Sequence, residues 1–150
     1  MTKPIIAPEF HALIPPLSDD ERIQLEANIK AEGCRDALVV WKGILLDGHN
    51  RFEICERIGI AYQTKTIELK DRATATEWII RNQFGRRNLS AYQRSVLAIR
   101  LEPIIAAKAK EKQRGGQGGI LLPKNSAKAI ETRESLASVA GVSHDTIHKT

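Results

Sequence analysis

The sequence contains few cysteines, few aromatic residues and no long hydrophobic run. Only Cys34 and Cys55 carry thiols among its 150 residues, and 5% of the residues are aromatic. The two cysteines do not have the spacing of metal ligands, and no apolar run approaches the roughly 18 residues that span a bilayer. The N-terminus is too short and too interrupted by proline for the core of a signal peptide. We therefore expect a cytoplasmic protein with reduced thiols, no metal site and no membrane partner.

The charges that are present divide unevenly between the two halves of the chain. Residues 1–70 carry nine Lys and Arg against eleven Asp and Glu, whereas residues 71–150 carry fourteen against seven. A basic segment attracts polyanions such as nucleic acid. The second half is therefore predicted to bind a polyanion, with a merely solvated basic face as the alternative.

Helix and strand patterns alternate over residues 1–85. Ser18 and Glu21 have the capping-box spacing of a helix start, and Gly33 can end that helix in a left-handed conformation. The preceding residues are expected to be extended, because Pro15-Pro16 blocks a helix. Periodicity and turn residues predict the other elements: a hairpin of strands 37–41 and 44–46 around Lys42-Gly43, a third strand at 61–69, and helices at 50–58 and 74–84. These elements predict a small α+β domain.

The stretch 45–54 has the layout of a strand that leads directly into a helix. The apolar strand ends at Asp47-Gly48, and a helix-forming segment with three polar residues begins at once: His49, Asn50 and Arg51. A helix N-terminus offers backbone N–H groups and the positive end of its dipole to an anion. Arg51 adds a planar fork that matches phosphate oxygens. The stretch predicts an anion site, with an ordinary tight turn and a solvent-facing arginine as the alternative.

Residues 86–150, which contain most of the basic residues of the second half, are predicted to be helical. Ser90 is a favourable N-cap for a long helix over 91–112, in which Pro103 predicts a kink or a break. The Gly-rich and polar residues 114–129 predict a flexible linker.

The last part of the chain, residues 132–150, has the pattern of a helix-turn-helix. Leu136, Ala137 and Ala140 share one helix face, and Gly141 breaks the helix at the tight turn. The second helix of such a unit enters the major groove of DNA, although a helical hairpin that only packs is the alternative. The chain ends about two turns into this helix, which suggests truncation at Thr150. The candidates for contact with DNA are Arg133, Ser143, His144, Thr146, His148 and Lys149.

Three motifs in this order resemble the ParB-like partition proteins, whose N-terminal domain is shared with sulfiredoxin. The motifs are residues 33–40, residues 47–53 and residues 81–90, and the helix-turn-helix follows them as it does in that family. The resemblance covers roughly residues 10–150 and is strongest to the ParB-like proteins of phages and mobile elements, often labelled "ParB-like nuclease domain". It implies a small mixed sheet with helices, followed by an all-α DNA-binding region.

The resemblance also implies a nucleotide site. In the family, the turn after the second strand and the loop between the later helices contact nucleotide phosphates, and the segment 33–38 lies near the base and ribose. The nucleotide is CTP with magnesium, and its binding closes a dimer clamp around DNA. Carried onto this chain, the phosphate-binding residues are Gly48, His49, Asn50, Arg51, Asn82, Gln83, Arg86 and Arg87.

Several positions depart from the pattern of the family. His49 and Asn50 replace the usual Glu-Arg of the first motif, and the second motif lacks its usual acidic residue. The loss of this carboxylate argues against metal binding and CTP hydrolysis. His49 also occupies the place of the catalytic cysteine of sulfiredoxin, which argues against that chemistry.

The leading hypothesis is therefore a ParB-like DNA-binding protein with a nucleotide site, acting in plasmid, chromosome or phage partition or in transcription regulation. Its expected partners are double-stranded DNA, a second copy of the chain and a partition ATPase, in association with the nucleoid or a plasmid. The alternative is an enzyme, either a nucleotide hydrolase or a nuclease. A nuclease needs clustered carboxylates for a metal, but Glu53 is expected to face solvent or to pair with Arg57.

Overall fold

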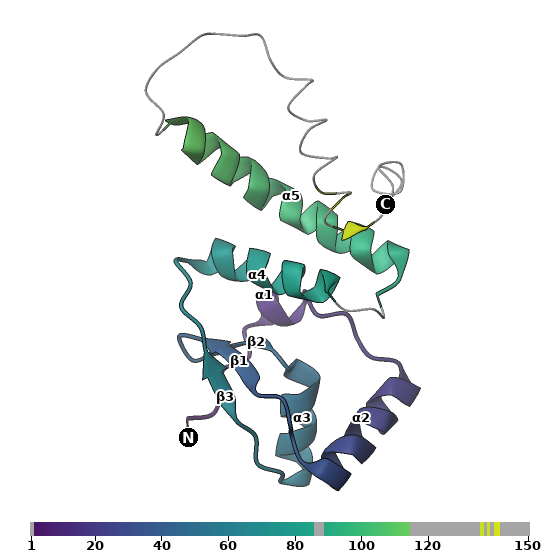
Figure 1. Cartoon of the computed structure of the whole chain (residues 1–150). Helices are drawn as coiled ribbons and strands as arrows, with labels where there is room; N and C mark the ends of the chain where they lie inside the picture. The colour runs from purple at the N-terminus through teal and green to yellow at the C-terminus, as the bar shows by residue number, and fades with distance from the viewer. Residues whose placement is uncertain (1, 86–88, 115–135, 137, 139, 142–150) are drawn as a thin grey trace. The chain divides into compact units, whose positions relative to one another are not determined.

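The computed structural model describes residues 2–85, 89–114, 136, 138 and 140–141 (Figure 1). The chain forms two compact units, residues 1–79 and 80–150. None of the helices described here is long and apolar enough to cross a membrane. The predicted domain division after residue 85 stays a prediction.

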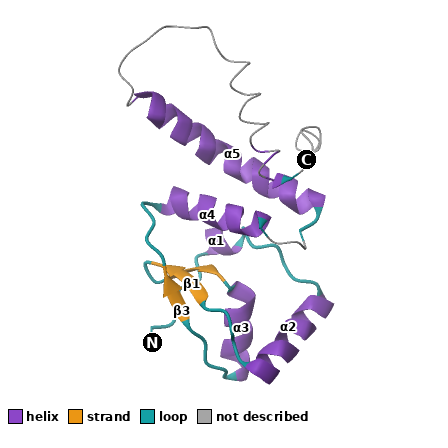
Figure 2. Cartoon of the chain, in the orientation of Figure 1, coloured by secondary structure: helices purple, strands orange, loops and turns teal. Residues whose placement is uncertain are grey.

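The first unit contains a three-stranded mixed sheet, drawn in orange in Figure 2. Strands β1 (Leu38–Trp41) and β2 (Ile44–Asp47) pair antiparallel, and β3 (Thr64–Thr66) pairs parallel to β1, which gives the order β2-β1-β3. Lys42 and Gly43 connect β1 and β2 with φ angles of 49° and 77°. Two consecutive positive φ angles are the geometry of the tight hairpin turn that the sequence predicts.

The described residues form five helices: α1 (Pro8–His11), α2 (Asp19–Glu32), α3 (His49–Ile58), α4 (Arg72–Phe84) and α5 (Ala91–Arg114). The α+β class is confirmed. The capping box of α2 is present, because the Ser18 hydroxyl accepts from Glu21 N at 3.3 Å and Glu21 Oε2 accepts from Ser18 N at 2.9 Å. Gly33 ends α2 with a φ of 75° but a ψ of −178°, so its conformation is glycine-specific without being left-handed helical.

Two expectations about the elements are wrong. Residues 8–11 form α1 rather than an extended lead-in, because proline is well suited to the first turn of a helix. The third strand covers three residues rather than nine, since only residues 64–66 pair with β1. Helix α5 continues through Pro103, so the expected break is absent, whereas the alternative expectation of a kink stays a prediction.

The core of the first unit lies between the sheet and α3. Leu38, Val40 and Leu45 of the sheet pack with Phe52 of α3, and Tyr62 covers them with its ring edge toward Phe52. A second cluster joins α3 to α2 and contains Ile29, Ile54 and Cys55. Because α3 is buried from two sides, the position of its first turn is fixed by the core.

Two ion pairs also join α2 and α3. Arg22 bonds Glu53 at 2.8 Å, and Arg57 bonds Glu26 at 2.5 Å. Glu53 is exposed, as one of the two expectations for this residue states, and its partner is Arg22 on the neighbouring helix rather than Arg57.

In the second unit, the buried residues of α5 include Leu97, Ala98 and Leu101. Ser90 caps α5, since its hydroxyl accepts from Gln93 N at 3.2 Å. Leu136 and Ala140, predicted to share the inner face of a helix, are both fully buried. The other residues of the predicted helix-turn-helix, and the predicted linker beyond Arg114, lie outside the described residues, except Ser138 and Gly141.

Candidate functional site

The predicted anion site lies where β2 ends and α3 begins. Gly48 is the N-cap of α3 and has a φ of 92°. A Cβ atom at this position would lie 2.6 Å from Leu38 Cδ2 and 3.1 Å from Arg51 Nη2. Such a short contact with a buried leucine leaves no room for a side chain. The turn therefore requires glycine both for its backbone angle and for its close packing.

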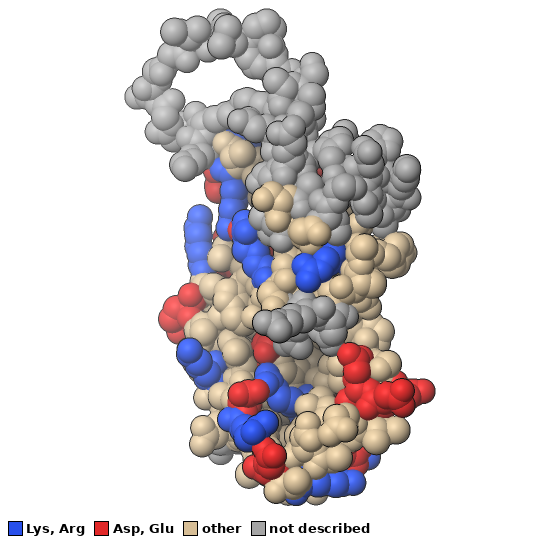
Figure 3. Space-filling model, turned by 45° about the vertical axis from the view of Figure 1, so that its right-hand side comes forward, with Lys and Arg blue, Asp and Glu red and all other residues tan. Residues whose placement is uncertain are grey.

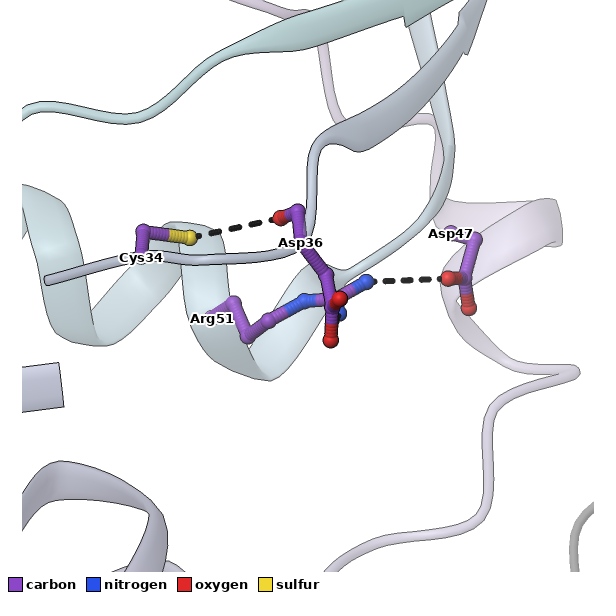
Figure 4. A network of polar contacts seen from close by, with 4 residues as sticks. All are labelled: Cys34, Asp36, Asp47 and Arg51. Atoms are coloured by element: carbon purple, nitrogen blue, oxygen red, sulfur yellow. Dashed lines mark hydrogen bonds and ion pairs between the residues drawn. The ribbon is translucent and has the colours of Figure 1, made fainter. Parts of the chain in front are cut away.

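Arg51 lies one helical turn further and is held by two carboxylates (Figure 4). Its Nη1 atom donates to Asp36 Oδ2 and its Nη2 atom donates to Asp47 Oδ2, each at 3.1 Å. The Arg51 side chain is 20% exposed. The interpretation of Arg51 as merely solvent-facing is therefore wrong, because its two terminal nitrogens point to carboxylates from two different segments.

The other two residues of the turn, His49 and Asn50, are less exposed than residues of a surface loop usually are. His49 is 4% exposed, and its ring lies 5.4 Å from the ring of His11, between centroids. Asn50 is half-buried. Gly48 has no side chain with which to cap the first turn of α3, so the first N–H groups of the helix depend on other partners.

Two cysteines that are 21 positions apart in sequence come together beside this turn. Cys34 packs against the cluster that contains Cys55, and its Sγ donates to the Asp36 carbonyl at 3.5 Å. Burial, reinforced by the neighbouring Cys34, raises the pKa of the Cys55 thiol to about 11. Cys55 is therefore a neutral packing residue at physiological pH.

Asn82 and Gln83 lie near the end of α4, in the second unit. Asn82 is half-buried, whereas Gln83 is 1% exposed and its Nε2 makes no hydrogen bond within the described part of the chain. A buried amide without a partner is unfavourable. Arg86, Arg87 and all six predicted DNA-contact residues lie outside the described residues.

Arg94 is a residue of the second unit that the sequence did not single out. Its Nη1 donates to the Phe84 carbonyl at 3.3 Å and to the Ala140 carbonyl at 3.1 Å. One guanidinium therefore joins the end of α4 to the segment that precedes the predicted recognition helix. Arg94 differs from the other arginines only in the carbonyls that lie next to it in the folded chain, so no local sequence pattern could have identified it.

The charged surfaces of the two units differ. Arg100, Lys108 and Lys110 are exposed on α5, whereas Asp19, Asp20 and Glu21 are exposed in the first turn of α2. Figure 3 shows the basic side chains in blue and the acidic side chains in red. Among the described residues, no three His, Cys, Asp or Glu side chains gather in a group that could hold a metal ion.

The fold matches solved structures of one class of protein domain. No protein-family model matches the sequence, and no curated protein matches it. Two solved structures are similar to this chain. One is the C2221 form of a Pnob8-like ParB-N domain, with a TM-score of 0.69 and 20% identity. The other is a pNOB8-like ParB N-domain, with a TM-score of 0.63 and 23% identity. Each match covers 95% of this chain, which spans 62% and 58% of those two chains.

These matches define the chain first as an α+β domain with a small mixed sheet and following helices. More particularly, it has the fold of a ParB-like N-terminal domain, which confirms at the level of the fold the resemblance seen in the sequence.

Proposed function

We propose that this chain is a DNA-binding ParB-like protein that acts in partition of a plasmid, chromosome or phage genome, or in transcription regulation. The observation that carries the proposal is the likeness of 95% of the chain to ParB N-domains. The order of the three sequence motifs and the basic second half support the same function independently.

The DNA-binding part of the proposal rests on charge and on the helix-turn-helix pattern. The exposed basic residues of α5 provide charges for phosphate contacts. The recognition residues that the sequence predicts would select the base sequence, with two copies of the chain on a two-fold site. A partition ATPase would be a further partner.

The nucleotide part of the proposal places a phosphate of CTP, accompanied by magnesium, at residues 48–51. Gly48 fits this role, because it is the N-cap of α3, where helix N–H groups favour an anion, and its missing side chain lets the Arg51 guanidinium lie close to the turn. Arg51 supplies a half-buried guanidinium beside it. Hydrolysis of the nucleotide and nuclease activity stay predictions that no described residue specifically favours.

Duplex binding tests the first part. We expect the chain to bind duplex DNA in a fluorescence-anisotropy titration, with an affinity that falls at least tenfold between about 50 and 200 mM salt, because binding releases counterions. Absence of binding to any duplex at the lower salt concentration, or binding that is indifferent to salt, would contradict it.

A CTP titration by isothermal calorimetry tests the second part. We expect binding by the unaltered chain and its loss in Arg51→Ala, with Lys65→Ala as the control. Lys65 is exposed in β3, which is separated from β2 by β1, so its removal changes the net charge equally without touching the turn. Equal binding by all three proteins would show that the nucleotide binds elsewhere.

A further inference from the structure

The two carboxylates that hold Arg51 differ in how firmly they are placed. Asp47 is the last residue of β2, pairs with Val39 of β1, and has a side chain that is 12% exposed. Asp36 precedes β1 in a segment without regular secondary structure, and its side chain is 82% exposed. Water therefore competes strongly for Asp36 and weakly for Asp47.

The balance of charge at this site is unfavourable for an anionic ligand. One guanidinium and two carboxylates together carry a net charge of −1 at neutral pH. A phosphate that approached Arg51 with both carboxylates in place would meet repulsion rather than attraction. The net charge of the site becomes zero only when one carboxylate leaves. The guanidinium nitrogen that this carboxylate releases then offers positive charge to a ligand.

We infer that Asp36 limits how tightly this site binds phosphate, because it competes with the ligand phosphate for Nη1 of Arg51. This inference rests on the proposed nucleotide site at residues 48–51. Asp36 is the carboxylate that exchanges, since an exposed ion pair contributes little to stability and its segment is not part of the sheet. Asp47 stays and keeps the guanidinium oriented through Nη2.

The exchange weakens the binding of any phosphate at Arg51. A ligand must replace an existing charge-assisted hydrogen bond and also tolerate the displaced carboxylate nearby. The repulsion from this carboxylate grows with the negative charge of the ligand. Asp36 therefore lowers the affinity of the site for phosphate ligands.

The test compares Asp36→Asn with the unaltered full chain by isothermal calorimetry, with CTP and with inorganic tripolyphosphate as separate ligands. We expect Asp36→Asn to bind both ligands about two- to fivefold more tightly, the range of an exposed ion pair. The gain should shrink at high salt, because screening weakens the repulsion that the substitution removes. Thermal unfolding without ligand should be nearly unchanged.

Glu68→Gln is the matched control. Glu68 is exposed and follows β3, whereas Asp36 precedes β1; because these strands are parallel, the two residues lie beyond opposite ends of the sheet. Glu68→Gln removes the same charge and should leave the affinity unchanged. Asp47→Asn should weaken binding, because Arg51 then loses the buried partner that orients it.

The outcomes separate this inference from the proposed function. If the unaltered chain binds CTP and Asp36→Asn binds it equally or less tightly, the inference is overturned and the nucleotide site stands. An equal gain in Glu68→Gln would also overturn it, by showing a general charge effect. If neither the unaltered chain nor Asp36→Asn binds either ligand, the nucleotide site itself is wrong.

Discussion

Gly48 combines a backbone requirement with a packing requirement, and the two can be separated experimentally. We expect Gly48→Ala to destabilise the fold by about 2–5 kcal/mol, since a non-glycine residue at positive φ costs about 1–2 kcal/mol and overpacking adds about 1–3 kcal/mol. Urea unfolding measures the change. The cause is the 2.6 Å approach of the new Cβ to Leu38 Cδ2.

Gly59→Ala is the control for this substitution. Gly59 ends α3 with a φ of 71°, and an added Cβ would meet nothing within 4 Å. Its replacement should cost only the backbone part, about 1–2 kcal/mol. Equal losses in the two variants would refute the packing requirement at Gly48.

Individual residues also show how far the sequence could predict the site. Gly48 and Arg51 were predictable, because a glycine between an apolar strand and a helix, followed by an arginine, is a local pattern. The resemblance places segment 33–38 near the same nucleotide, but the ion pair of Asp36 with Arg51 was not predictable, since it forms only through the folding of the loop before β1 against α3. Burial of His49 depends on α1, which the sequence did not predict.

At the scale of the element, Pro103 is the feature of α5 that runs against helix stability. A proline inside a helix lacks the N–H of one backbone hydrogen bond and costs about 3 kcal/mol. Pro103 lies inside α5 and is exposed. We therefore expect Pro103→Ala to stabilise the chain by about 1–3 kcal/mol in urea unfolding.

Lys110→Ala serves as the control in α5, because this exposed residue should tolerate alanine within about 0.5 kcal/mol. A loss of stability in Pro103→Ala would show instead that the bend imposed by the proline is needed for packing.

The pairing of α2 with α3 makes stability depend on acid pH. Hydrogen bonds from Lys30 and Arg57 lower the pKa of Glu26 from 4.5 to about 2. A carboxyl group with a lowered pKa in the folded state stabilises the fold above pH 4.5, and this contribution disappears as the pH falls from 4.5 to about 2.

Glu26→Gln should therefore be less stable than the unaltered chain at pH 7, and the two should converge near pH 2. Urea unfolding across this pH range measures the difference. A constant difference at every pH would mean that Glu26 acts through packing rather than through its charge.

At the scale of the whole molecule, charge is divided between the two units. Residues 1–79 carry ten Lys and Arg against thirteen Asp and Glu, whereas residues 80–150 carry thirteen against five. If the second unit contacts DNA, Lys110→Glu should weaken duplex binding and lower the slope of log affinity against log salt by about one.

Lys65→Glu is the matched reversal in the first unit, at an exposed position of β3. It should leave the affinity and the slope nearly unchanged. Fluorescence anisotropy at several salt concentrations measures both. Equal weakening by the two reversals would indicate that DNA responds to total charge rather than to a surface of the second unit.

The order of the helices and strands was more predictable than the residues at which each of them ends. Capping residues, the Lys42-Gly43 turn and local periodicity depend on near neighbours in sequence, and they predicted, in the correct order, every described element except α1. The length of β3 depends on pairing with β1, which is more than 20 residues away. Continuation of α5 through Pro103 likewise reflects packing of Leu97 and Leu101, which local propensity does not contain.

The hydrogen bonds of Arg94 have a consequence for how this protein can change during evolution. Arg94 bonds the carbonyl of Phe84, ten positions before it, and the carbonyl of Ala140, 46 positions after it. A substitution at Arg94 would leave both carbonyls without this donor at once. We therefore expect this position to vary less between related proteins than the exposed positions of α5.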